Sequence, residues 1–195
     1  MIIGVTGSLG TGKSTVARML AKRGAKVLDA DKIGHRALRK NSDTYKRIIS
    51  RLGKNVLNAG KAIDKKKLAK RVFGNRKKLK QLTDIIHPFV TDRIIEYLKQ
   101  KNVSDIVIID APLLIEAKLI DLLDKLIVVK TRRGVQLYRC MKGKKIKREE
   151  ALSRIKNQMP LSKKVKMADY VIDNNATMED TRKQVDQIRR QIKWT

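Results

Sequence analysis

The sequence predicts an α/β fold in which a parallel sheet is flanked by helices. Short apolar runs that end at glycine or aspartate are typical of buried parallel strands. Between these runs, apolar residues recur at helical spacing, and such alternation of strands and helices favours a parallel sheet. Hydrophobic residues make up 42% of the 195-residue chain, which is enough for a core.

The N-terminal stretch is expected to form a strand, a glycine-rich loop, a helix and a second strand. Residues 2–6 are a short apolar run that leads into a glycine-rich turn. Helical periodicity covers residues 13–23, and Gly24 ends it. Residues 26–28 form the second strand, which ends in Asp29-Ala30-Asp31.

The middle of the chain changes character and reads as an inserted helical subdomain. It is lysine-rich and contains no clear strand pattern. Its apolar residues follow helical spacing: Leu68, Val72, Phe73, Leu79, Leu82, Ile85, Ile86, Val90, Ile94, Ile95 and Leu98. We expect residues 32–102 to form this insert within a nucleotide-binding core made of residues 1–31 and 103–195.

Beyond the insert, strands and helices alternate again. Strands are expected at residues 106–109, 126–129 and 170–172. Helices are expected at residues 135–141, 149–159 and 178–192, with a basic turn at 142–147 and Thr177 as the cap of the last helix.

Composition limits the class of protein. The single cysteine, Cys140, permits no internal disulfide, and no run of about 18 apolar residues could span a membrane. The N-terminus lacks the features of a signal peptide, so we expect a soluble, cytoplasmic protein, monomeric or weakly homo-oligomeric. The net charge of +28 favours anionic partners, although a lysine-rich solvated surface would give the same excess.

The strongest motif is a phosphate-binding loop. Residues 7–14 read GSLGTGKS and fit G-x-x-x-x-G-K-[ST] at every fixed position, between a predicted strand and a predicted helix. Gly7 and Gly12 allow backbone angles that turn N–H groups toward a phosphate, and the helix N-terminus adds its positive dipole end. We therefore expect a P-loop NTPase-type sheet that binds ATP with Mg²⁺. The residues expected to bind ATP here are Gly7, Leu9, Gly10, Thr11, Gly12, Lys13, Ser14, Thr15 and Val16.

Three carboxylates are candidates for the chemistry. Ser14 is expected to ligate Mg²⁺ directly, and Asp110, at the end of a buried strand, is expected to act on it through water. Asp110 has a second interpretation as a turn or cap residue. Asp29 and Asp31 follow the second strand, and Asp31 is our candidate for the base that accepts a hydroxyl proton from the acceptor. The alternative for Asp31 is a helix cap.

A basic lid is expected at about residues 139–160. Arg139 leads into a lysine-rich turn, and cations closing over the γ-phosphate would stabilise the charge of a transferring phosphoryl group. Arginine suits planar phosphate contacts better than lysine does. Any single lysine of the turn is as well explained by a solvated surface.

Taken together, these blocks resemble the dephospho-coenzyme A kinase family from Ile3 to about Ile188. The matching blocks are GVTGSLGTGKSTVA, VLDAD, LAKRVF followed by HPFV, DAPLLIE, QLYR, EEALSRIKNQM and ADYVIDNN. The resemblance implies ATP-dependent phosphorylation of the ribose 3′-hydroxyl of dephospho-coenzyme A. One position departs from the family pattern, because Gly143 stands where a second lid arginine is usual. Lys142, Lys144 or Lys145 could substitute for it.

The resemblance also implies site residues. By analogy, Asp31 is the base or orienting group, and Arg139 is the lid arginine that contacts ATP. The acceptor side would comprise His87 with Pro88, Pro112, Leu113, Leu114 and Glu116. Asn174 and Asn175 would lie on the adenine side. His87 is equally well read as a helix-boundary residue before a proline, and the two asparagines as turn residues.

Three other functions would each require sequence features of their own. A kinase for a nucleoside or another small hydroxyl compound would carry the same phosphate loop, because that loop reads only the donor. A GTPase switch would need an Asn-Lys-x-Asp element, and the chain instead reads Lys-Thr-Arg-Arg after Val129. A specific nucleic-acid partner is not expected, because the few aromatic residues are scattered.

Overall fold

The computed structural model describes residues 1–22, 24–72, 74–102, 104–143 and 145–192. The chain divides into two compact units, each described here by itself. Unit 1 comprises Met1–Asp29 and Asn102–Thr195, and unit 2 comprises Ala30–Lys101. Arg23, Phe73 and Lys144, which the sequence placed in helices or in the basic turn, lie outside the described residues.

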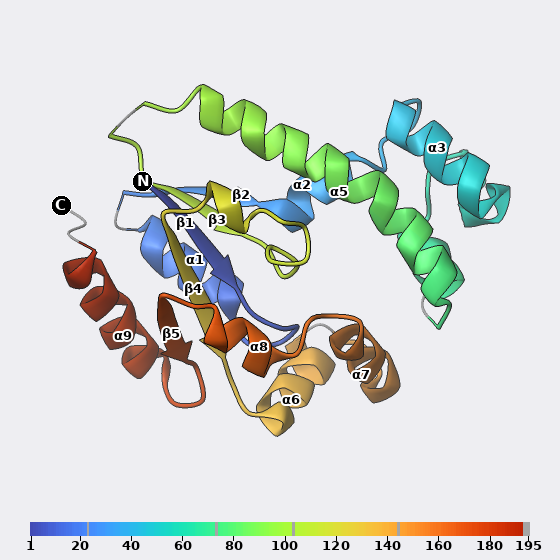
Figure 1. The fold of residues 1–195 in the computed structure, drawn as a ribbon. Coiled ribbons are helices and arrows are strands. Elements are labelled where there is room, and N and C mark those ends of the chain that lie inside the picture. Colours follow the sequence, from blue (N-terminus) through green and yellow to red (C-terminus); the bar gives the residue numbers. More distant parts are fainter. Residues whose placement is uncertain (23, 73, 103, 144, 193–195) are drawn as a thin grey trace. The chain divides into compact units, whose positions relative to one another are not determined.

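Unit 1 is built on a five-stranded parallel sheet in the order β2-β3-β1-β4-β5 (Figure 1). The strands are β1 (Ile2–Thr6), β2 (Lys26–Asp29), β3 (Val107–Asp110), β4 (Lys125–Lys130) and β5 (Tyr170–Asp173). The central strands are almost wholly buried, which explains their continuous apolar sequences. The predicted α/β class with a parallel sheet is therefore confirmed.

Helices complete unit 1. They are α1 (Lys13–Ala21), α6 (Arg133–Gly143), α7 (Arg148–Lys156), α8 (Leu161–Lys166) and α9 (Met178–Gln191), with a 3₁₀ turn at Ile120–Leu122. Helices α1 and α9 pack together against the sheet through one apolar core. That core includes Ile3, Val5, Val16, Leu20, Ile108, Ile127, Val129, Val185 and Ile188. As predicted, Thr177 caps α9, in a capping box with Asp180.

The predicted elements after β4 need two corrections. Helix α6 continues through Gly143, where a turn was expected, since a single glycine weakens a helix without having to end it. The helix expected to reach Met159 ends at Lys156, and Pro160 then opens the short helix α8, which the sequence did not predict. Proline has no N–H to continue the first helix, yet its fixed φ suits the start of the next one.

Unit 2 is helical, as its periodicity predicted. Its elements are α2 (Ala30–Arg36), α3 (Asp43–Leu52), a 3₁₀ turn (Lys54–Val56), α4 (Lys65–Val72) and α5 (Arg76–Lys99). Apolar residues of α3, α4 and α5 share one core, which includes Tyr45, Ile48, Leu52, Leu68, Val72 and Ile85. The β-pairing among its described residues is one isolated bridge between Leu57 and Ile63.

Helix α5 corrects one interpretation of His87. Pro88 lies inside this 24-residue helix, so His87 is not a helix-boundary residue. A proline inside a helix removes one backbone hydrogen bond, but the turns on either side keep theirs. The exposed side of the helix, on which Pro88 lies, needs no packing partner. The half-buried His87 therefore stands at mid-helix, beside the exposed Pro88.

Candidate active site

The predicted phosphate loop joins β1 to α1 in unit 1. Gly12 is the N-cap of α1, and because glycine has no side chain, no side-chain hydrogen bond caps the first turn of the helix. The backbone N–H groups at that end are therefore available to an anion, and the helix dipole favours negative charge there. Within the loop, Thr11 closes a tight turn by donating both its N–H and its hydroxyl to the Ser8 carbonyl, at 3.2 and 2.9 Å.

Two glycines of the loop are required by their surroundings. Gly12 has φ of 93°, and a Cβ on it would collide with the Asn174 amide nitrogen. Gly10 has φ of 81°, and its Cβ would lie 2.6 Å from the Gln136 carbonyl oxygen of α6. The glycine pattern therefore serves both the turn of the loop and the close packing of α6 and Asn174 against it.

Asn174 supports the phosphate loop from behind. It follows β5, is only 4% exposed, and donates from Nδ2 to the Thr11 carbonyl at 2.8 Å. Its Oδ1 accepts from the Thr181 hydroxyl of α9 at 2.9 Å. The Asn174 side chain, which the sequence analysis assigned to the nucleotide, thus bonds to the protein through both of its polar atoms. The neighbouring Asn175 accepts hydrogen bonds from the Thr131 hydroxyl and the Arg132 N–H.

Lys13 and Asp110 form the charged floor of the site. The Lys13 Nζ lies 3.8 Å from the Asp110 carboxylate, and the two side chains are 10% and 5% exposed. Asp110 ends β3 opposite Val5 of the neighbouring strand, so parallel pairing carries the carboxylate to the edge where the loop begins. Ser14 is exposed at the start of α1. The structure thus brings three predicted residues to one end of the sheet.

Arg139 of α6 reaches the same loop. Its Nη1 lies 3.7 Å from the Cβ position of Gly12, and this buried nitrogen has no hydrogen-bond partner among the described residues. A half-buried guanidinium group with such a nitrogen is suited to a phosphate oxygen. The sequence analysis expected Arg139 to contact ATP only as part of a lid.

Sequence reasoning missed two residues that contact this region. Gln158, between α7 and α8, accepts hydrogen bonds at Oε1 from the Ser8 hydroxyl at 2.9 Å and from the Leu9 N–H at 3.0 Å. Lys164 of α8 is fully buried and pairs with Glu116. Gln158 lies in a block that supported the resemblance, but its partner could not be read from it. One buried lysine among 47 basic residues gives no signal in the sequence.

Comparisons with known proteins identify the family. The family model described as dephospho-CoA kinase matches residues 1–180. The chain belongs to the dephospho-CoA kinase family. A dephospho-CoA kinase of Carboxydothermus hydrogenoformans is 44% identical over 195 residues, covering 99% of this chain and 95% of that protein.

Solved structures agree with this family. The dephospho-CoA kinase from Campylobacter jejuni has a TM-score of 0.71 and 31% identity, covering 98% of this chain and 96% of that one. A shikimate kinase from Acinetobacter baumannii, at 20% identity and a TM-score of 0.54, shares the fold alone. None of the helices in the described part of the chain is long and apolar enough to cross a bilayer.

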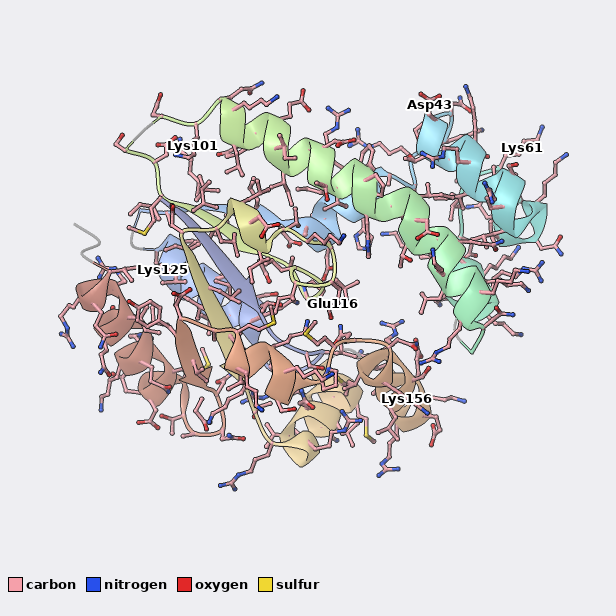
Figure 2. The ribbon with its side chains drawn as sticks, in the orientation of Figure 1. Asp43, Lys61, Lys101, Glu116, Lys125 and Lys156 are labelled. Atoms are coloured by element: carbon pink, nitrogen blue, oxygen red, sulfur yellow. The ribbon has the colours of Figure 1, made fainter. Side chains whose placement is uncertain are left out.

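The remaining site positions suggested by the family resemblance fall in both units. In unit 1, Pro112, Leu113 and Glu116 lie on the loop after β3, on which Figure 2 labels Glu116. In unit 2, Asp31 is exposed in the first turn of α2, and His87 lies on α5. Helix α2 begins at Ala30, so Asp31 is a residue of that helix rather than the residue that precedes it.

Proposed function

We propose that this protein transfers the γ-phosphoryl group of ATP to the ribose 3′-hydroxyl of dephospho-coenzyme A. The observation that carries the proposal is the family match over residues 1–180. The phosphate loop, with Lys13, Asp110 and Arg139 gathered around it, is the equipment that such a donor requires. The products are coenzyme A and ADP.

On the donor side, the loop amides and Lys13 hold the β- and γ-phosphates of ATP. Thr15, one residue into α1 from Ser14, is proposed to bond the α-phosphate. Arg139 places its charge where negative charge gathers on the equatorial oxygens of the transferring group. Because Lys13 and the Nη1 atom of Arg139 are buried, their attraction for the phosphates is weakly screened.

On the acceptor side, we propose that Asp31 receives the proton of the 3′-hydroxyl. The 3′-oxygen then bonds to the γ-phosphorus as the bond from that phosphorus to the β,γ-bridging oxygen breaks, and the electron pair leaves with ADP. The exposed position of Asp31 leaves its carboxylate open to a bound acceptor. By the family resemblance alone, His87, Pro112, Leu113 and Glu116 are proposed as acceptor-side residues.

The residues present fit a magnesium ion. Magnesium prefers oxygen donors and is held by one or two protein groups together with substrate phosphates and water. The Ser14 hydroxyl and the Asp110 carboxylate, both in unit 1 at the loop end of the sheet, are such oxygen donors. When bound, Mg²⁺ neutralises charge on the phosphate oxygens.

The proposal is tested by an acceptor screen. Purified protein with ATP and Mg²⁺ should convert dephospho-coenzyme A to coenzyme A, with ADP formed in equal amount. Efficient turnover of a nucleoside, with none of dephospho-coenzyme A, would favour the second kinase hypothesis instead.

The role of Asp31 has its own test. Asp31→Asn should lower kcat by about 10²-fold or more, the range of general acid–base catalysis, with little change in the Kd for ATP. Asp92→Asn, an exposed carboxylate of α5 in the same unit, is the matched control and should keep wild-type turnover. Unchanged kcat in Asp31→Asn would remove Asp31 from the mechanism.

The proposed reaction uses small metabolites of the cytoplasm, and we propose that compartment for the protein. We also propose that it acts as a monomer or weak homo-oligomer. Sedimentation velocity over a range of protein concentrations measures the oligomeric state directly.

A further inference from the structure

A chain of polar contacts links the segment between α7 and α8 to the phosphate loop. Gln158 is its point of contact, since its one Oε1 accepts from both the Ser8 hydroxyl and the Leu9 N–H. Ser8 is 3% exposed, and both bonds are partly buried.

The next residue, Met159, anchors Gln158 in place. Its backbone N–H donates to Glu116 Oε1 at 2.8 Å. Glu116 lies on the loop after β3. Figure 2 labels it, and also labels Lys156 at the end of α7. The Met159–Glu116 bond therefore ties the Gln158 turn to the loop after β3, in addition to the hydrogen bond from the Gln158 N–H to the Ile155 carbonyl at the end of α7.

Glu116 is itself held by Lys164, the largest fully buried side chain of the described residues. The Lys164 Nζ lies 2.9 and 3.0 Å from the two Glu116 oxygens and donates to the Pro112 carbonyl at 2.6 Å. Burial lowers the pKa of Lys164, while the hydrogen bond and the charge of Glu116 oppose that shift. Breaking a buried pair on one side leaves an uncompensated charge, so the pair holds both segments firmly.

This arrangement decides how Glu116 is used. Both of its carboxylate oxygens are engaged by Lys164, and one also accepts from Met159. An acceptor that bound to Glu116 would have to compete with a buried ammonium group. The geometry favours a role in positioning the Gln158 turn over direct contact with a substrate.

We propose that Gln158 is a positioning residue that fixes the Ser8–Leu9 half of the phosphate loop for ATP, and that the Glu116–Lys164 pair anchors it. The inference rests on the proposed function only in taking ATP as the donor. Through Gln158, the α7–α8 segment of the expected lid is tied to the loop. The anchor makes ATP affinity depend on residues that do not touch ATP.

The first test removes the acceptor oxygen of Gln158 and keeps the shape of its side chain. Gln158→Met should weaken ATP binding about tenfold, equivalent to about 1.4 kcal/mol, in a direct titration with a fluorescent ATP analogue. The melting temperature should change little. Asn157→Ala, at the exposed neighbouring position, is the control and should bind ATP as the wild type does.

Ser8→Ala supplies a double-mutant cycle. If the two side chains act through one contact, the double variant Ser8→Ala with Gln158→Met should be less impaired than the sum of the single variants. Strict additivity, or a Gln158→Met variant with a lowered melting temperature and unchanged ATP affinity, would overturn the proposal by reducing Gln158 to a structural role.

The second test addresses the anchor. Lys164→Met should weaken ATP binding, whereas Lys163→Met, an exposed lysine of the same helix, should not. If Lys164→Met does not fold, the paired variant Glu116→Gln with Lys164→Met leaves no buried charge and keeps an oxygen for the Met159 N–H. Wild-type ATP affinity in a folded paired variant would rule out the anchor.

The titration needs no acceptor, so the two proposals fail separately. A wild-type protein that binds ATP but does not phosphorylate dephospho-coenzyme A would contradict the proposed function alone. Wild-type ATP affinity in Gln158→Met would contradict the positioning role alone.

Discussion

Asn174 offers the sharpest test of how the phosphate loop is held. Asn174→Ala removes the donor to the Thr11 carbonyl and the acceptor of the Thr181 hydroxyl. Thr181 keeps a second acceptor, the Thr177 carbonyl at 3.0 Å, so its loss is small. The Thr11 carbonyl loses its buried partner, and an unsatisfied buried group costs about 1–3 kcal/mol. With a small cavity added, the free energy of unfolding should fall by about 2–4 kcal/mol.

Gly12 makes this prediction a coupling experiment. Gly12→Ala forces a Cβ onto a residue with φ of 93° and into the Asn174 amide. The backbone part of the penalty is about 1–2 kcal/mol, and the collision adds to it. Truncating Asn174 removes the collision and leaves the backbone part. The double variant should therefore be more stable than the sum of the single changes implies, by about 1 kcal/mol or more.

The assay is urea unfolding of the four proteins, followed by circular dichroism. Thr181→Val serves as a graded control, because it removes one hydroxyl and leaves the Asn174 contact to Thr11 in place; it should cost about 1 kcal/mol. If Gly12→Ala and Asn174→Ala prove additive within about 0.3–0.5 kcal/mol, the loop is not braced by Asn174 as described.

Further predictions concern the helix cap and the core of unit 2. Thr177→Ala should lower the free energy of unfolding by about 1 kcal/mol in urea, because α9 loses its side-chain cap. Hydrogen bonds from Thr177 hold the pKa of Asp180 below its usual 3.8. The stability contributed by the ionised Asp180 is therefore complete above pH 3.8 and is lost as the pH falls through its lower folded-state pKa. The acid limb of the stability curve should therefore be shallower in Thr177→Ala, and an identical limb would contradict the assignment. Ile48→Ala, at a fully buried position, should cost about 2–5 kcal/mol, whereas the exposed neighbouring change Arg47→Ala should stay within about 0.5 kcal/mol.

Much of the fold could be predicted because its signals are local. Each strand of the sheet is a short apolar run, and periodicity located α1, α9 and the helical character of unit 2. Errors fell where local signals compete. Pro88 suggested a boundary inside α5, and Gly143 suggested a turn at the end of α6, but in each case the helix continues.

Within the candidate site, the phosphate loop was the part most readable from the sequence. Gly7 to Ser14 form one contiguous motif, so the loop and its Lys13 were readable directly from the sequence. Asp110 was expected at the same edge of the sheet as the loop, because parallel strands end at one edge, but its pairing with Lys13 was not predicted. Asn174, by contrast, was assigned to the nucleotide, and the fold gives both ends of its side chain to the protein.

The sequence by itself determined the donor chemistry and the fold class, because a phosphate loop is built from neighbouring residues whose backbone angles follow from their types. Only the tertiary structure decided what surrounds that loop. Gln158 and Asn174 bond to loop residues that lie 149 and 163 positions away in the sequence, and Lys164 is removed from solvent where it pairs with Glu116. Such contacts depend on how packed elements meet, and an exposed lysine and a buried one look the same in a basic sequence.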